Sequence, residues 1–222
     1  MLFLLAIPRI CLLVQADLGR PPIQRVFKKK EIDRYLVVID TNDPAGKTHI
    51  EFELRMSAEH PITDSSDTSV RATFQNLRET IDGRIAPSNK VFGVATYRFP
   101  KSGFPVDFTF AKGTPFMIPI LSWYTPSEAL SSNLSFKVPE MVFDDLVHVS
   151  GQGGYKDVDS HEGSVQLDLT FAASEQAQQY CVGGSVFHSI ATFSLNSGVL
   201  LKSEGDLKRP DGITLTFRTK KV

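Results

Sequence analysis

Strict alternation of apolar and polar side chains is the feature of this sequence that most limits its fold. In residues 50–56 the apolar side chains fall at every second position, and charged ones lie between them. Residues 165–171 repeat the same pattern. Because successive side chains of a strand point to opposite faces, this pattern buries one face and leaves the other in water. It is typical of antiparallel sheets and barrels.

Further strand signals extend over most of the chain. Turn signals rich in Gly, Pro, Asn and Asp separate them, as at residues 42–46 and 196–198. The β-rich stretches are residues 35–39, 49–56, 70–74, 91–99, 106–110, 116–121, 165–171, 182–193 and 213–219. Strands at this spacing predict an all-β domain over residues 35–222, as an antiparallel β-barrel of about eight strands or a sandwich.

The composition agrees with this fold class and excludes others. Sixteen Phe against one Trp, with 13 Pro and 15 Gly, favour strands and turns over helices. The 24 basic and 25 acidic residues nearly cancel, which excludes the uniform positive field of a nucleic-acid binder. Two cysteines are too few for a disulfide-rich scaffold.

Two segments precede the expected β domain. Residues 1–16 are apolar apart from Arg9 and Gln15, and they are shorter than the roughly 20 residues that a membrane-spanning helix needs. They are a candidate signal or targeting segment, with a buried strand, a short helix or a truncated gene model as alternatives. Residues 17–34 are expected to form an extended basic arm, either solvated or docked on an acidic partner. Its cations are Arg25, Lys28, Lys29 and Lys30.

Residues 125–163 interrupt the strand pattern. They are rich in Ser, Gly and Pro, and acidic residues outnumber basic ones. We expect a long irregular loop that projects from the barrel, because structureless stretches of this length are usually functional or disordered.

The chain lacks the common catalytic motifs. There is no Walker loop, dinucleotide fingerprint, zinc-protease helix or nucleophile elbow. The glycine run at residues 151–154 lacks the lysine of a phosphate loop and predicts a flexible or tightly turned loop. Oxygen ligands for Ca²⁺ are available at Asp144, Asp145, Asp157 and Asp159, although their spacing matches no twelve-residue calcium loop.

Several short motifs occur in the order seen in one known family. Residues 136–139 (FKVP), 143–145 (FDD) and 151–157 (GQGGYKD) are the most specific, and residues 72–83, 104–110 and 184–190 add to them. Across about residues 48–219 the chain resembles the extrinsic manganese-stabilising protein of photosystem II. It departs from that family at Gln152, where the family has Arg, at residues 140–142, and in lacking an N-terminal cysteine pair.

The resemblance implies a function without catalysis. It implies a lumenal subunit, peripheral to the plastid thylakoid membrane, that stabilises the oxygen-evolving manganese cluster and shapes its water, proton and chloride environment. The implied partners are the photosystem II core and other extrinsic subunits, with no cofactor of its own. Binding is then expected through Arg25, Lys28, Lys29 and Lys30 of the arm, and through Phe136, Val138, Pro139, Asp144, Asp145, Gly151, Gly153, Gly154, Tyr155, Asp157 and Asp159 of the loop.

Two other classes compete with this interpretation. One is a lipid- or pigment-binding barrel of the lipocalin or plastid lipid-associated type, whose apolar cavity the sixteen Phe would suit. The other is a secreted carbohydrate-binding or adhesion sandwich. The interior discriminates between scaffold and carrier, because large side chains fill the interior of a scaffold whereas a carrier keeps an open apolar cavity.

Overall fold

The computed structural model describes residues 23–25, 27–28, 31–44, 46–59, 67–86, 94–100, 102–105, 115–127, 135–143, 147–159, 162–173 and 183–222. Its strands, in chain order, are β1 (Ile32–Asp43), β2 (Gly46–Ala58), β3 (Asp67–Ile81), β4 (Arg84–Ile85), β5 (Val94–Pro100), β6 (Ser135–Phe143), β7 (Val147–Asp159), β8 (Ser164–Ala173), β9 (Val186–Ser194), β10 (Leu200–Lys208) and β11 (Thr214–Lys221). One 3₁₀-helix, η1 (Pro115–Trp123), lies between β5 and β6 in the chain. The all-β prediction is confirmed.

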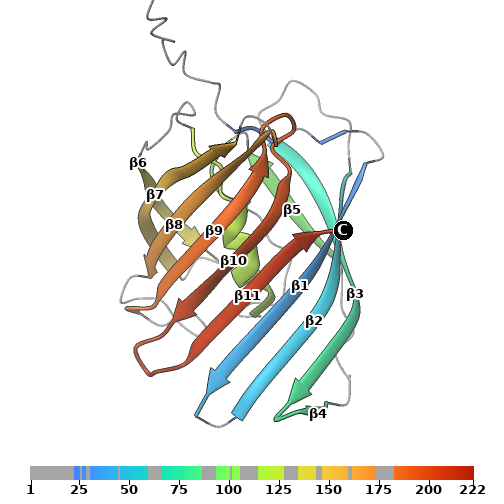
Figure 1. The fold of residues 1–222 in the computed structure, drawn as a ribbon, viewed down its shortest axis with the longest axis vertical. Helices are drawn as coiled ribbons and strands as arrows, with labels where there is room; N and C mark the ends of the chain where they lie inside the picture. The colour runs from blue at the N-terminus through green and yellow to red at the C-terminus, as the bar shows by residue number, and fades with distance from the viewer. Residues whose placement is uncertain are drawn as a thin grey trace, which may run out of the picture.

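All eleven strands belong to one antiparallel sheet. Their order is β4-β3-β2-β1-β11-β10-β9-β8-β7-β6, and β5 also pairs with β3. The first and last strands are neighbours, with Tyr35 opposite Lys221. Figure 1 shows this sheet curving around η1. The curvature gives the sheet an inner face, which packs, and an outer face, which meets solvent.

The expected closed barrel of about eight strands is not what the described strands form. One end of the sheet is occupied by β4 and β5, and the other by β6, and no described strand pairing joins β5 to β6. The physical reason is that alternation specifies only that one face is buried. Closure depends in addition on strand tilt and register around the whole sheet, which no local pattern encodes.

The inner face carries the core that alternation predicted. In β2, the side chains of Phe52 and Leu54 are buried, while those of Glu51, Glu53 and Arg55 are not. In β8, Val165, Leu167, Leu169 and Phe171 are at most 1% exposed. The predicted inward register of residues 50–56 and 165–171 is therefore confirmed.

The interior is occupied by η1, where residues 116–121 were expected to form a strand. A short apolar run cannot be assigned to strand or buried helix by periodicity, and Pro119 removes a ladder hydrogen bond. The Ser122 hydroxyl is hydrogen-bonded to that of Ser189 on β9, with the oxygens 2.9 Å apart. The Trp123 ring packs edge-on against Tyr35 of β1, with centroids 5.2 Å apart. These contacts attach η1 to the sheet.

The prediction of a long irregular loop over residues 125–163 is wrong for much of that range. Residues 135–143 and 147–159 are β6 and β7, paired with each other and, through β7, with β8. The glycines that suggested a loop allow close packing. A Cβ on Gly151 would lie 2.0 Å from the Thr170 carbonyl oxygen, and one on Gly153 would lie 2.5 Å from the Phe136 ring.

The described part of the N-terminal arm packs against β5 and against the turn between β9 and β10. Ile23 and Phe27 are buried, and the Phe27 ring lies edge-on to Phe99 of β5. Gly198 leaves room for this segment, because a Cβ there would lie 2.2 Å from the Gln24 carbonyl oxygen. The candidate targeting segment, residues 1–16, lies outside the described residues. Nowhere in the described ranges is there a helix long and apolar enough to cross a membrane.

Candidate functional site

Most of the binding residues expected on the loop are instead part of two strands. Phe136 and Val138 of β6 and Tyr155 of β7 are buried, and the Phe136 and Tyr155 ring centroids are 5.6 Å apart. Gly151 and Gly153 also lie on the inner face, as their contacts above show. The side chains of Phe136, Val138 and Tyr155 are therefore part of the core.

The remaining loop residues occupy varied places. Gly154 is half-buried on the outer face of β7, while Pro139 and Asp157 belong to β6 and β7. Asp159 ends β7, and its carboxylate accepts a hydrogen bond from the Glu162 backbone N–H, 3.0 Å away, which stabilises the turn to β8. Asp144 and Asp145 lie outside the described residues.

The expected arm cations are divided between the core and the surface. The Arg25 guanidinium forms an ion pair with Asp33 and lies over the Phe27 ring, 4.2 Å from its centroid. Asp33 also accepts from the Lys221 ammonium at 2.6 Å. Arg25 therefore attaches the arm to the sheet. Lys28 is exposed, and Lys29 and Lys30 lie outside the described residues.

A charged network on the outer face of β7–β10 is the best candidate site. His188 of β9 lies between two carboxylates, with its Nε2 3.0 Å from Asp168 of β8 and its Nδ1 3.7 Å from Asp206 of β10. Lys156 and Lys208 flank it, 3.8 Å from Asp168 and 3.0 Å from Asp206. These five side chains place an imidazole among groups of both charge signs.

A shallow cavity adjoins this network. Its volume is about 340 Å³, and its wall includes Ser135, Gln152, Thr170 and Asp168 from β6, β7 and β8. Gly154 stands between Ser135 and Asp168 in the register of these strands, and its missing side chain leaves the space open. The cavity and the network together form what we call the outer polar surface: Ser135, Gln152, Lys156, Asp168, Thr170, His188, Asp206 and Lys208.

Local sequence patterns do not identify this surface. Alternation places Asp168 on the outer face of its strand, but it cannot tell which side chains of other strands lie beside it. That depends on the register, in which Thr170 is opposite His188 and His188 is opposite Asp206. The β10 strand was also missed, because Ser203 and Gly205 interrupt its apolar pattern.

A second charged group lies farther along the outer face, on β1–β3. Glu53 accepts hydrogen bonds from the Nε atoms of Arg34 (2.8 Å) and Arg55 (2.7 Å), and from the Asn76 amide at 3.3 Å. The hydrogen bonds from Arg34 and Arg55, of which that from Arg34 has the larger effect, lower the pKa of Glu53 from 4.5 to about 2. The guanidinium groups of Arg34 and Arg55 are thus both paired with a carboxylate within the sheet.

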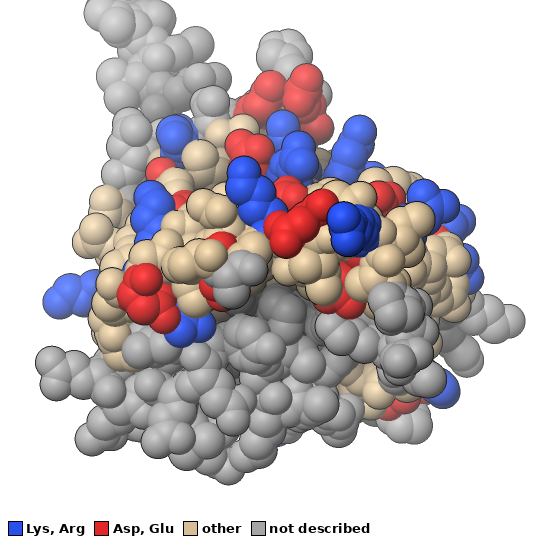
Figure 2. Space-filling view, turned by 90° about the horizontal axis from the view of Figure 1, so that it is seen from below, with Lys and Arg blue, Asp and Glu red and all other residues tan. Residues whose placement is uncertain are grey.

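The described residues on the face seen in Figure 2 show no single dominant charge. Seen from below in Figure 2, acidic and basic side chains are interspersed over the described surface. Among the described residues, no three His, Cys, Asp or Glu side chains are grouped so as to hold a metal ion. Because Asp144 and Asp145 are not among these residues, the calcium expectation stays a prediction.

Comparison with known proteins adds no relative. No family model matches the chain, and no curated protein matches it. The function is therefore inferred from the geometry of the sheet and from the short motifs of the sequence.

Proposed function

We propose that this chain is a non-catalytic docking protein that binds a protein assembly through the outer polar surface of β6–β10. The observation that carries this proposal is the packed inner face. Trp123, the last residue of η1, and Tyr124, which follows it, pack among Tyr35, Phe136 and Phe171 of the sheet. Rings that fill the interior support a scaffold over a carrier, whose interior must receive a ligand.

The chemistry of the outer polar surface suits a protein partner. It presents both signs of charge, from Lys156 and Lys208 and from Asp168 and Asp206, at fixed positions on paired strands. Charges held on a rigid sheet give specificity and orientation more than raw affinity, and their effect is screened by salt. The surface therefore predicts salt-sensitive, oriented binding.

The expected partner is the lumenal side of photosystem II, as the ordered motifs of residues 136–157 imply. Lys28, Lys29 and Lys30 of the arm are proposed as a second contact. In this proposal the bound chain stabilises the manganese cluster by covering it and by ordering water beside it, and it performs no catalysis.

The test is rebinding to thylakoid membranes whose extrinsic proteins have been removed by salt washing. Wild-type protein is expected to sediment with the membranes and to restore oxygen evolution. The charge-reversed double variant Lys156→Glu/Lys208→Glu is expected to dissociate at a lower salt concentration, with affinity reduced at least tenfold.

A matched control is available at the far end of the sheet. Lys47→Glu/Arg84→Glu makes the same charge change at two exposed positions of β2 and β4, and it should bind like wild type. Equal release of both double variants would contradict docking through the outer polar surface. Failure of the wild type to bind, together with a lipid or pigment copurifying from native extracts, would favour the carrier instead.

A further inference from the structure

Four hydrogen-bond donors form a continuous row across the outer face of β8–β11. Gln166 lies opposite Thr192, Thr192 opposite Lys202, and Lys202 opposite Lys220. The row thus presents an amide, a hydroxyl and two ammonium groups on four adjacent strands. It contains no acidic side chain.

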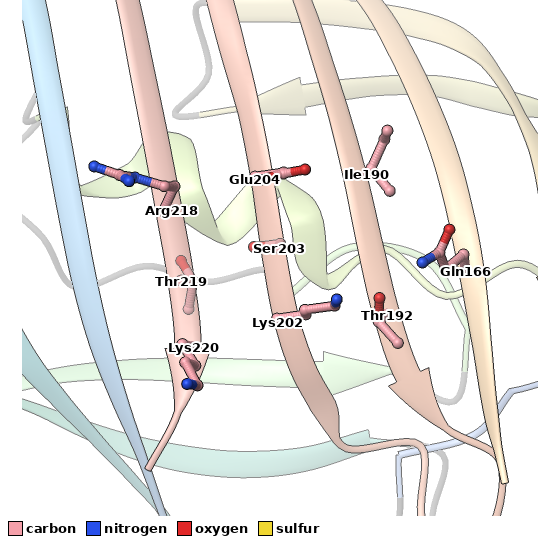
Figure 3. Close-up of a pocket in the computed structure, with 9 residues that line it drawn as sticks. All are labelled: Gln166, Ile190, Thr192, Lys202, Ser203, Glu204, Arg218, Thr219 and Lys220. Carbon is pink, nitrogen blue, oxygen red and sulfur yellow. The ribbon is translucent and has the colours of Figure 1, made fainter. Parts of the chain in front are cut away.

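These four residues line one cavity of about 260 Å³. In Figure 3, the Lys202 ammonium and the Gln166 amide nitrogen both point toward Thr192, which stands between them on β9. Thr192 is only 7% exposed although it lies on the outer face. Its side chain therefore forms a recessed part of the cavity wall.

None of the four side chains has a hydrogen-bond or ion-pair partner elsewhere in the described part of the chain. Lys202 and Lys220 are directly opposite each other, an arrangement that destabilises a sheet when nothing compensates it. The neighbouring charged residues Arg218 and Glu204 do not offset the repulsion between these two lysines. Arg218 is 3.8 Å from Asp40 of β1, and the Glu204 carboxylate points toward Ile190 in Figure 3.

A β-bulge next to the cavity sets the position of Lys202. The register of β10 against β9 shifts between Leu200 and Lys202, so that Leu200 faces Phe193 and Lys202 faces Thr192. Bulges commonly re-aim a side chain beside a binding site. Here the bulge brings the ammonium into line with the neutral donors.

We propose that this row is a binding site for a phosphate group. A tetrahedral oxyanion has four oxygens, which can accept hydrogen bonds from donors on several strands. A carboxylate has only two oxygens. The lysine charges favour an anion, and the open side of the cavity leaves room for free phosphate or for the phosphate of a small ester. Glu204, on the cavity wall, can accept a hydrogen bond from a protonated phosphate oxygen, which sulfate lacks at neutral pH.

The test is calorimetric titration of the full chain at constant ionic strength. Inorganic phosphate should bind saturably, and sulfate and acetate at least tenfold more weakly. Lys202→Gln/Lys220→Gln should lose at least tenfold in phosphate affinity, while Lys47→Gln, an exposed lysine on β2, should bind like wild type. Thermal unfolding checks that each variant is folded.

The site and its ligand source are separable in the same experiment. Titration with methyl phosphate distinguishes two sources of the phosphate group. If the site takes a phosphate ester, methyl phosphate should bind at least as tightly as inorganic phosphate. Weaker binding of methyl phosphate indicates the free ion. Glu204→Gln should reduce the preference for phosphate over sulfate. Absence of saturable phosphate binding, equal binding of acetate, or unchanged affinity in the double lysine variant would overturn the proposal. The titration needs no membrane partner, so its result does not depend on whether the docking proposal is correct.

Discussion

At the scale of single residues, burial decides how much an ion pair matters. Asp33 sits at the start of β1 with a side chain 3% exposed, and it holds both Arg25 and Lys221. Asp40, later in the same strand, pairs with His49 and Arg218 but is 45% exposed. Water screens the second set of pairs and not the first.

This contrast gives a prediction. Asp33→Asn leaves two cations without their carboxylate and should lower the free energy of unfolding by about 3–5 kcal/mol, the usual effect of breaking a buried pair. Asp40→Asn should lower it by less than about 1 kcal/mol. Urea denaturation of both variants measures the difference. Equal effects would show that the arm is not held by Asp33.

Glu53 makes stability depend on pH. Its pKa is lowered to about 2 in the folded chain by hydrogen bonds from Arg34 and Arg55. A carboxyl whose folded pKa is depressed stabilises the protein fully above its unfolded pKa, near 4.5, and this contribution is lost as the pH falls toward 2.

Glu53→Gln should therefore reduce stability at pH 6 and flatten its decline between pH 4.5 and 2. The measurement is the unfolding free energy as a function of pH. Glu51→Gln is the control, because Glu51 lies on the same face of β2 and has no hydrogen-bond partner among the residues that the structure describes. The same flattening in the control would contradict the role of Glu53.

At the scale of elements, the glycines of β7 determine how closely three strands approach. Gly151 lies opposite Val138 of β6 and Phe171 of β8. The Thr170 carbonyl and the Phe171 backbone occupy the space that a side chain would need. These positions explain why a strand can contain the sequence Gly-Gln-Gly-Gly.

Gly151→Ala should destabilise the protein by about 1–3 kcal/mol through overpacking. Gln152→Ala, at the next residue of the same strand, is exposed and should change stability by less than about 0.5 kcal/mol. Thermal unfolding compares the two. A Gly151→Ala protein as stable as wild type would indicate that β7 is not packed as described.

At the scale of the whole molecule, the end of η1 packs against the inner face of the curved sheet. Trp123 at its end is 5% exposed and packs on Tyr35, and Ser122 is bonded to Ser189. Burial raises the pKa of the Tyr35 phenol. Among the described residues, the end of η1 is therefore packed against the inner face of the sheet.

Trp123→Ala should lower the free energy of unfolding by about 3–5 kcal/mol, because it removes a large buried side chain at the end of η1. Circular dichroism during urea denaturation is the appropriate readout, since Trp123 is the only tryptophan of the chain. Leu36→Ala, on the outer face of β1, should cost far less. Unchanged stability of Trp123→Ala would mean that η1 is dispensable and would revive the carrier alternative.

The sequence by itself determined the fold class and the orientation of its clearest strands. Alternation at residues 50–56 and 165–171 is a local property, and burial of Phe52 and Leu167 follows directly from it. The same reasoning failed where local signals were weak or ambiguous: at the proline-containing run of η1, at the glycine-containing β7 and at β10.

Only the tertiary structure decided that the described strands form an open sheet, that the Arg25 side chain is buried, and which outer side chains are neighbours. His188 meets Asp168 and Asp206, and Lys202 meets Thr192, across strand pairs whose register is a property of the assembled sheet. The physical reason is that a strand's own sequence specifies which face each side chain takes. It does not specify which residue of another strand will lie beside it.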